Sequence, residues 1–100
     1  MGGENVSAQE IERVILAVSG VREVAVVGRP DPFLDEVPVA FLLATDPADP
    51  TLVERVTAAC GQTLATFKRP RAVRVLEEFP RVTLEKVAKA ELRTMATQSR

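Results

Sequence analysis

The segment VREVAVVGRPDPFLDEVPVAFLLA, residues 21–44, contains two short apolar runs, at 24–27 and 37–43, and the first of them is rich in β-branched residues. Each run is too short for a typical helix, and neither alternates apolar with polar side chains. We therefore predict two strands buried on both faces, the first of which ends at Gly28. Residues 29–36 between them include Pro30 and Pro32, which cannot donate to a strand ladder, so we expect a shaped surface loop there rather than a tight hairpin.

Helical periodicity flanks this segment on both sides. Ser7 and Glu10 form a capping box, which predicts a helix over 8–18 whose apolar residues recur every three to four positions. Thr51 and Glu54 form a second capping box and predict a second helix. The side of that helix expected to be buried carries Leu52, Val56, Ala59, Cys60 and Thr63.

The remaining residues supply a third strand and a third helix. Alternation predicts the strand at 73–76, and a last helix places Ala88, Leu92 and Met95 on one side. Glu85 and Lys89 are spaced for an i,i+4 ion pair. The order helix, strand, strand, helix, strand, helix predicts an α+β fold, a small three-stranded sheet covered by helices, in a single domain over 1–100.

Composition narrows the possible chemistry. The 100 residues are 46% hydrophobic and 27% charged, which is typical of a folded globular domain. They include one cysteine, Cys60, and no histidine, which excludes an internal disulfide and the usual zinc, haem and Ser-His-Asp sites. We interpret Cys60 as a small core residue. Because no apolar stretch approaches the ~20 residues that span a bilayer and no signal peptide is evident, we expect a cytoplasmic protein without membrane insertion.

The net charge of −1 conceals a difference between the two halves of the chain. Residues 1–50 carry three basic and nine acidic side chains, whereas residues 51–100 carry ten basic and five acidic ones. Such a division indicates either an anion-binding face or two charged surfaces that attract each other within the fold. With four aromatic residues, all phenylalanine, and no basic run with interleaved stacking residues, nucleic acid is not expected as a partner.

Two basic features are candidates for function. Lys86 stands in the irregular stretch 80–86, where a loop meets the last helix, and Lys68-Arg69-Pro70-Arg71 forms a compact basic turn. From the residues alone, a solvated surface position is the simplest interpretation of both. No glycine-rich stretch follows a strand into a helix, so the chain by itself is not expected to hold ATP.

Five motifs, in order along the chain, resemble those of the C-terminal domain of adenylate-forming enzymes. They are Gly3-Glu4-Asn5-Val6-Ser7 with Glu10-Ile11-Glu12, Gly20-Val21 with Val24–Gly28 and Pro30-Asp31, Glu36-Val37-Pro38-Val39-Ala40-Phe41, Phe67-Lys68-Arg69-Pro70, and Phe79-Pro80-Arg81 with Lys86-Val87, Lys89 and Glu91-Leu92-Arg93. The resemblance spans residues 2–93. It implies the small C-terminal domain of an acyl-CoA synthetase, of a type similar to carnitine/crotonobetaine-CoA ligases.

This resemblance implies a function for Lys86. In the family, the lysine of the last motif is the catalytic lysine that promotes attack of a carboxylic acid on ATP, and Lys86 matches it. The implied partners are the chain's own large N-terminal domain, the acid and CoA, with ATP and Mg²⁺ bound mainly by that large domain. We expect the present chain to lack both the large domain and the hinge, and therefore to be inactive alone.

The resemblance also implies where CoA passes. Gly2, Gly3, Glu4 and Asn5 match the segment that borders the pantetheine tunnel in the family. Lys68 and Arg69, together with Arg71, then become candidate partners for the phosphates of CoA.

One position departs from the family pattern, and two other functions remain open. Glu85 stands where the family usually has glycine, which disfavours a positive-φ turn and puts a carboxylate beside the lysine. Within the same superfamily, the chain could belong to an amino-acid-activating domain that loads a carrier protein. From another class, it could be a stand-alone α+β interaction module without a catalytic role.

Overall fold

The structure is a computed structural model and describes residues 8–98. Its elements are helix α1 (Ala8–Leu16), strands β1 (Val21–Asp31) and β2 (Asp35–Ala44), helix α2 (Leu52–Thr63), the 3₁₀ turn η2 (Thr66–Lys68), strand β3 (Ala72–Leu76) and helix α3 (Lys89–Gln98). The predicted order of helices and strands and the α+β class are confirmed. Helix α1 ends at Leu16, two residues before the predicted end, and Ser7 of the first capping box lies outside the described residues.

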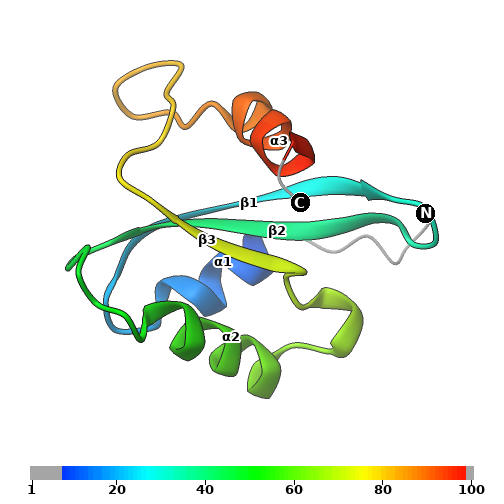
Figure 1. The fold of residues 1–100 in the computed structure, drawn as a ribbon, viewed down its shortest axis with the longest axis horizontal. Helices are drawn as coiled ribbons and strands as arrows, with labels where there is room; N and C mark the ends of the chain where they lie inside the picture. The colour runs from blue at the N-terminus through cyan, green and yellow to red at the C-terminus, as the bar shows by residue number, and fades with distance from the viewer. Residues whose placement is uncertain (1–7, 99–100) are drawn as a thin grey trace.

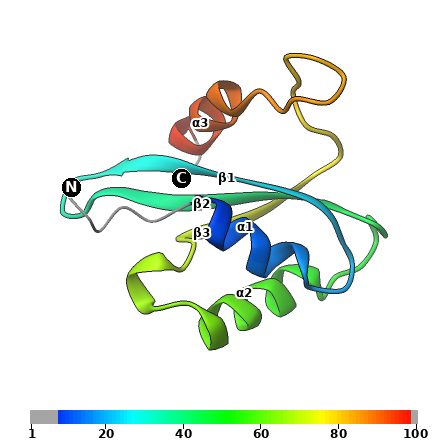
Figure 2. The same ribbon diagram turned by 180° about the vertical axis from the view of Figure 1, so that it is seen from behind.

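The three strands form one sheet in the order β1-β2-β3. Strand β1 pairs with β2 in antiparallel fashion, and β2 pairs with β3 in parallel, which α2 makes possible as the crossover between them. Helices α1 and α2 cover one face of the sheet and α3 covers the other (Figure 1; Figure 2 shows the same arrangement from behind). The central strand β2 is therefore covered on both sides.

Each face of the sheet has its own core. The core under α1 and α2 consists of Ile11, Ile15, Val21, Val26, Ala40, Leu42, Leu52, Val56, Cys60 and Leu64. The core under α3 consists of Ala25, Val27, Val39, Phe41, Leu43, Phe79, Leu92 and Ala96. Neighbouring residues of β1 and β2 thus alternate between two apolar cores, which explains why both strands are continuously apolar in sequence.

The expected long loop at 29–36 is wrong. The β1–β2 ladder continues through Pro30↔Glu36 and Asp31↔Asp35, which leaves a tight hairpin. Since the N–H of Val26 points away from β2, the nitrogen of Pro30, four residues along the same strand, faces the same open edge. The ladder therefore loses no hydrogen bond at this proline.

The hairpin turn is closed by side-chain and backbone features of two acidic residues. Asp31 accepts hydrogen bonds through Oδ2 from the backbone N–H groups of Phe33 (3.0 Å) and Leu34 (2.9 Å). Asp35 adopts a positive φ of 73°. Because a short acidic side chain tolerates the left-handed region better than most residues, this turn needs no glycine.

The capping box predicted at Thr51 and Glu54 is also wrong. The Thr51 side chain makes no capping hydrogen bond, and its hydroxyl instead donates to Oδ1 of Asp49 at 2.7 Å. Asp49 also accepts from the backbone N–H of Thr51 at 2.8 Å and pairs with Arg55 at 2.6 Å. The start of α2 is therefore organised by Asp49, two residues before the predicted cap.

Candidate functional site

Lys86 lies in a loop that projects from the body of the domain between β3 and α3 (Figure 1). The two segments that lead into and out of this loop, its legs, are joined by an antiparallel β-bridge between Arg81 and Val87. They are also joined by a hydrogen bond from the Ala88 N–H to the Pro80 carbonyl at 2.8 Å. The Val82 N–H donates to the Lys86 carbonyl, also at 2.8 Å. We call residues 82–86, which form the tip, the Lys86 loop.

A threonine hydroxyl shapes the turn that ends at Lys86. Oγ1 of Thr83 accepts hydrogen bonds from the backbone N–H of Glu85 at 3.3 Å and of Lys86 at 3.1 Å. Within residues 8–98, positive φ values occur at Gly20 and Asp35, and Glu85 is not among them. The turn therefore accommodates glutamate in the position before the lysine without backbone strain.

The Lys86 side chain is exposed. Within the described part of the chain, its Nζ has no hydrogen bond or ion pair. Two large apolar side chains of the same loop, Val82 and Leu84, are 65% and 95% exposed. The ammonium group is thus carried on a projecting loop and can face another molecule or domain.

The loop is fixed at its base. Phe79, just before the first leg, is buried in the core under α3. Nη2 of Arg81 lies 2.7 Å from Oε1 of Glu23 on β1. The base of the loop is therefore attached to the sheet while its tip projects.

The basic turn is engaged with the rest of the domain. Nζ of Lys68 lies 3.2 Å from Oε1 of Glu10 and 5.8 Å from the centroid of the Phe67 ring. Arg69 donates from Nε to the Leu64 carbonyl at 3.0 Å and from Nη2 to the Gly61 carbonyl at 2.9 Å. Because these carbonyls stand at the C-terminal end of α2, Arg69 caps that helix.

Arg71 completes this group and makes a longer contact. Its Nη1 lies 3.7 Å from Oδ1 of Asp31, at the end of β1. The structure therefore brings Lys68, Arg69 and Arg71 to one region of the domain, whereas the Lys86 loop projects from the other side of the sheet.

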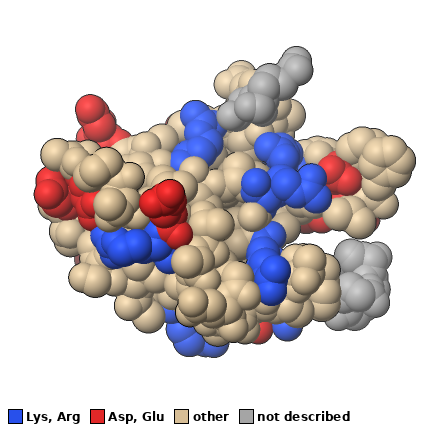
Figure 3. Space-filling model, turned by 60° about the horizontal axis from the view of Figure 1, so that its bottom comes forward, with Lys and Arg blue, Asp and Glu red and all other residues tan. Residues whose placement is uncertain are grey.

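The difference in charge between the two halves of the sequence has a structural explanation. All five ion pairs among residues 8–98 join an acidic residue of the first half to a basic residue of the second. Figure 3 shows Lys and Arg side chains in separate groups, some of them beside Asp or Glu, on the face it presents. Internal attraction between oppositely charged segments therefore accounts for much of the asymmetry.

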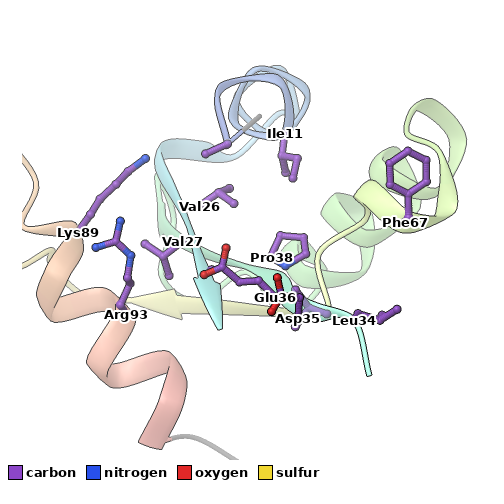
Figure 4. Close-up of a pocket in the computed structure, with 13 residues that line it drawn as sticks. Ile11, Val26, Val27, Leu34, Asp35, Glu36, Pro38, Phe67, Lys89 and Arg93 are labelled. Carbon is purple, nitrogen blue, oxygen red and sulfur yellow. The ribbon is translucent and has the colours of Figure 1, made fainter. Parts of the chain in front are cut away.

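A groove of about 700 Å³, which sequence reasoning missed, begins beside the first described residue, Ala8. Ile11, Val26 and Pro38 contribute apolar surface to it. Figure 4 shows Lys89 and Arg93 on the α3 side, Asp35 and Glu36 on the hairpin side and Phe67 beyond them. Because it draws residues from α1, β1, β2, η2 and α3, no local pattern in the sequence could have revealed it.

Three further observations limit the chemistry of the described residues. Cys60 is 1% exposed and burial raises the pKa of its thiol, which confirms it as a core residue. No group of three or more Cys, Asp or Glu side chains in residues 8–98 is placed to hold a metal ion. None of the helices in the same range is long and apolar enough to cross a membrane.

The predicted CoA-tunnel residues Gly2, Gly3, Glu4 and Asn5 lie outside the described residues.

Comparisons with known proteins agree with this arrangement. The family described as "AMP-binding enzyme C-terminal domain" matches residues 10–86. The 2-succinylbenzoate–CoA ligase of Listeria monocytogenes serotype 4b (strain F2365) is 37% identical over 92 residues, which are 92% of this chain and 19% of that protein. The long-chain-fatty-acid–CoA ligase FadD13 of Mycobacterium tuberculosis is 40% identical over 92 residues, 92% of this chain and 18% of its own length.

Solved structures give the same result for the fold. The apo structure of MatB from Rhodopseudomonas palustris matches with a TM-score of 0.87 and 35% identity, over 97% of this chain and 19% of that one. A fatty acyl-CoA synthetase of Mycobacterium tuberculosis matches with a TM-score of 0.81 and 39% identity, over 97% of this chain and 19% of that one. The chain thus spans about a fifth of the length of these relatives. It belongs to the AMP-binding enzyme C-terminal domain family, the small domain of adenylate-forming acyl-CoA ligases.

Proposed function

We propose that this chain acts with a large ATP-binding domain as an acid–thiol ligase. The pair of domains would first join a carboxylic acid to AMP and then transfer the acyl group to CoA. The observation that carries the proposal is the geometry of Lys86, an exposed ammonium without a described partner on a projecting loop with a fixed base. That is the arrangement needed to bring a positive charge into a site on another domain.

The first step requires two anions to meet. A carboxylate oxygen forms a bond to the α-phosphorus of ATP, and the bond from that phosphorus to the pyrophosphate oxygen breaks. An ammonium between the carboxylate and phosphate oxygens offsets the charge that builds up as the new bond forms. Lysine suits this role because it is a compact charge on a flexible stem. ATP and its Mg²⁺ would be held mainly by the large domain.

The second step requires a path for CoA, whose thiol displaces AMP from the acyl-adenylate. We place the pantetheine arm beside Gly2, Gly3, Glu4 and Asn5. The groove that begins at Ala8 supports this placement, because Ala8 follows that segment closely and the groove has apolar walls.

The phosphates of CoA would then lie near the basic turn that follows Phe67 in the same groove. Lys68 and Arg71 are candidate partners, because both are at least partly exposed and their ion pairs lie near the surface. Arg69 already uses Nε and Nη2 to cap α2, so its contribution would come from its remaining N–H groups.

The relatives favour CoA over a carrier protein as the acyl acceptor, since both curated relatives described above are named as CoA ligases. Their acids differ, 2-succinylbenzoate in one and long-chain fatty acids in the other. We therefore propose that the large domain selects the acid and that this domain supplies chemistry common to all of them.

The test is Lys86→Ala in the two-domain enzyme, meaning this chain joined to its large domain. ATP–pyrophosphate exchange measures the first step, and thioester formation from supplied acyl-adenylate and CoA measures the second. We expect exchange to fall by about 100-fold or more, as for loss of other groups that stabilise transition-state charge, while thioester formation is largely retained. Exchange at the unmodified rate would refute the role of Lys86.

A further inference from the structure

Glu12 connects three elements at the edge of the sheet. Its Oε2 accepts a hydrogen bond from the Val26 N–H on β1 at 2.8 Å and another from Nζ of Lys89 on α3, also at 2.8 Å. Helices α1 and α3 lie on opposite faces of the sheet, so this carboxylate spans the free edge of β1. Figure 4 shows the Lys89 side chain extending from α3 toward α1.

This contact replaces an interaction predicted from the sequence. The expected i,i+4 pair between Glu85 and Lys89 is wrong, because Glu85 stands in the Lys86 loop before the helix begins and Lys89 is the first residue of α3. Lys89 instead fixes the start of α3 to a residue 77 positions away.

The same position makes Lys89 a support for the Lys86 loop. The second leg of the loop runs directly into α3 through Ala88, which is buried and bonded to Pro80. The first leg is held by Arg81 and Glu23 at 2.7 Å. Both legs of the loop are therefore attached to the rest of the domain. The first leg is attached to β1 through Arg81, and the second is attached to α1 and β1 through Lys89 and Glu12.

We propose that Glu12 and Lys89 are positioning residues for Lys86. Their ion pair sets where α3 begins over the edge of β1, and so sets the direction in which the loop presents its ammonium. The inference rests on the proposed function of Lys86 in adenylation. It assigns neither residue a contact with substrate.

Energetics separate this role from a purely structural one. The Lys89 and Glu12 side chains are 39% and 21% exposed, and ion pairs of this kind add little to folding stability. Glu12→Gln retains an oxygen that can accept from Val26 while removing the charge that attracts Lys89. Lys89→Met removes the ammonium but keeps an unbranched stem. Both variants are therefore expected to fold and to leave the loop less well directed.

The experiment compares the two half-reactions in the two-domain enzyme. We expect Glu12→Gln and Lys89→Met each to lower the kcat of ATP–pyrophosphate exchange about fivefold, the rate equivalent of ~1 kcal/mol, with KM for ATP little changed. Thioester formation from supplied acyl-adenylate should change less than about twofold in Glu12→Gln, because Glu12, unlike Lys89, does not line the groove assigned to CoA. Lys89→Arg, which keeps the charge, should restore exchange, and the double variant should be no worse than either single one.

Arg55→Met is the matched control. It breaks the ion pair with Asp49, which lies at the start of α2 and away from the loop, and should leave both half-reactions unchanged even if the melting temperature falls. Equal losses in both half-reactions for Glu12→Gln, or no loss in exchange for either variant, would overturn the inference. If Lys86→Ala itself leaves exchange unchanged, the proposed function fails; if only Glu12→Gln and Lys89→Met are without effect, the positioning role alone fails.

Discussion

Leu92 is the side chain on which the attachment of α3 to the sheet most depends. Leu92 and Ala96 are the buried residues of this helix, and Leu92 is 0% exposed in the core under α3. Removing a fully buried leucine side chain costs about 2–5 kcal/mol, depending on how far the surroundings collapse into the space. Because α3 is held by so few buried residues, it can shift inward, so we expect Leu92→Ala to cost about 3 kcal/mol.

Urea and thermal unfolding of the 100-residue chain, followed by circular dichroism, measure this cost. A loss of ~3 kcal/mol corresponds to a fall of about 12–24 °C in melting temperature for a domain of this size. Leu84→Ala is the matched control, because the same substitution at a side chain that is 95% exposed should change stability by less than ~0.5 kcal/mol. A loss below ~1 kcal/mol for Leu92→Ala would show that α3 does not pack on this face as described.

Three further predictions concern other parts of the domain. The pKa values of Asp31 and Asp49 are lowered, chiefly by backbone N–H donors from Leu34 and Thr51 respectively. Each carboxylate therefore stabilises the fold at pH values above the unfolded pKa of about 3.9. This stabilisation is lost as the pH falls through the lower pKa of the folded state. The difference in melting temperature between the unmodified chain and Asp31→Asn or Asp49→Asn should therefore shrink below about pH 4, and a difference constant with pH would contradict this. Cys60 should resist iodoacetamide in the folded chain and react after denaturation, whereas rapid labelling of the native chain would contradict its burial. Gly20→Ala should lower the stability by about 1 kcal/mol or more, because φ at this position is +100°. Gly61→Ala lies in α2 with open space around it and should raise the stability by about 0.5–1 kcal/mol. Urea denaturation that ranks the two variants in the opposite order would refute this explanation.

The sequence was sufficient to predict the elements whose signals are local. The runs at 24–27 and 37–43 are apolar because the strands contact two cores, and this pattern is visible without knowing either partner. The apolar spacing in α1 and α2 likewise identified most of their buried residues, including Cys60, but Thr63, which was expected on the buried side of α2, is exposed. Lys86 could be singled out because of a motif resemblance and its place before the last helix, and its exposure is consistent with both.

Features that depend on distant partners could not be predicted in the same way. Whether Pro30 interrupts a ladder depends on which side of β1 faces β2, and residues 29–36 do not contain that information. Lys89 pairs with Glu12 and not with Glu85, although Glu85 is nearer in sequence. An i,i+4 pair would need a helix that includes Glu85, whereas α3 begins four residues later, at Lys89. The groove combines five elements, so its existence follows from the tertiary arrangement alone.

The glutamate that replaces glycine before Lys86 bears on how the loop keeps its shape. A glycine in that position allows a turn with positive φ, whereas here Glu85 keeps φ outside that region and Thr83 supplies two hydrogen bonds that close the turn. A side-chain hydroxyl and two attached legs thus restrict the loop where backbone freedom would otherwise be available. Because the loop is restricted in advance, it loses less conformational entropy when the ammonium is placed against phosphate oxygens. The departure from the family pattern is therefore compatible with the proposed adenylation role of Lys86.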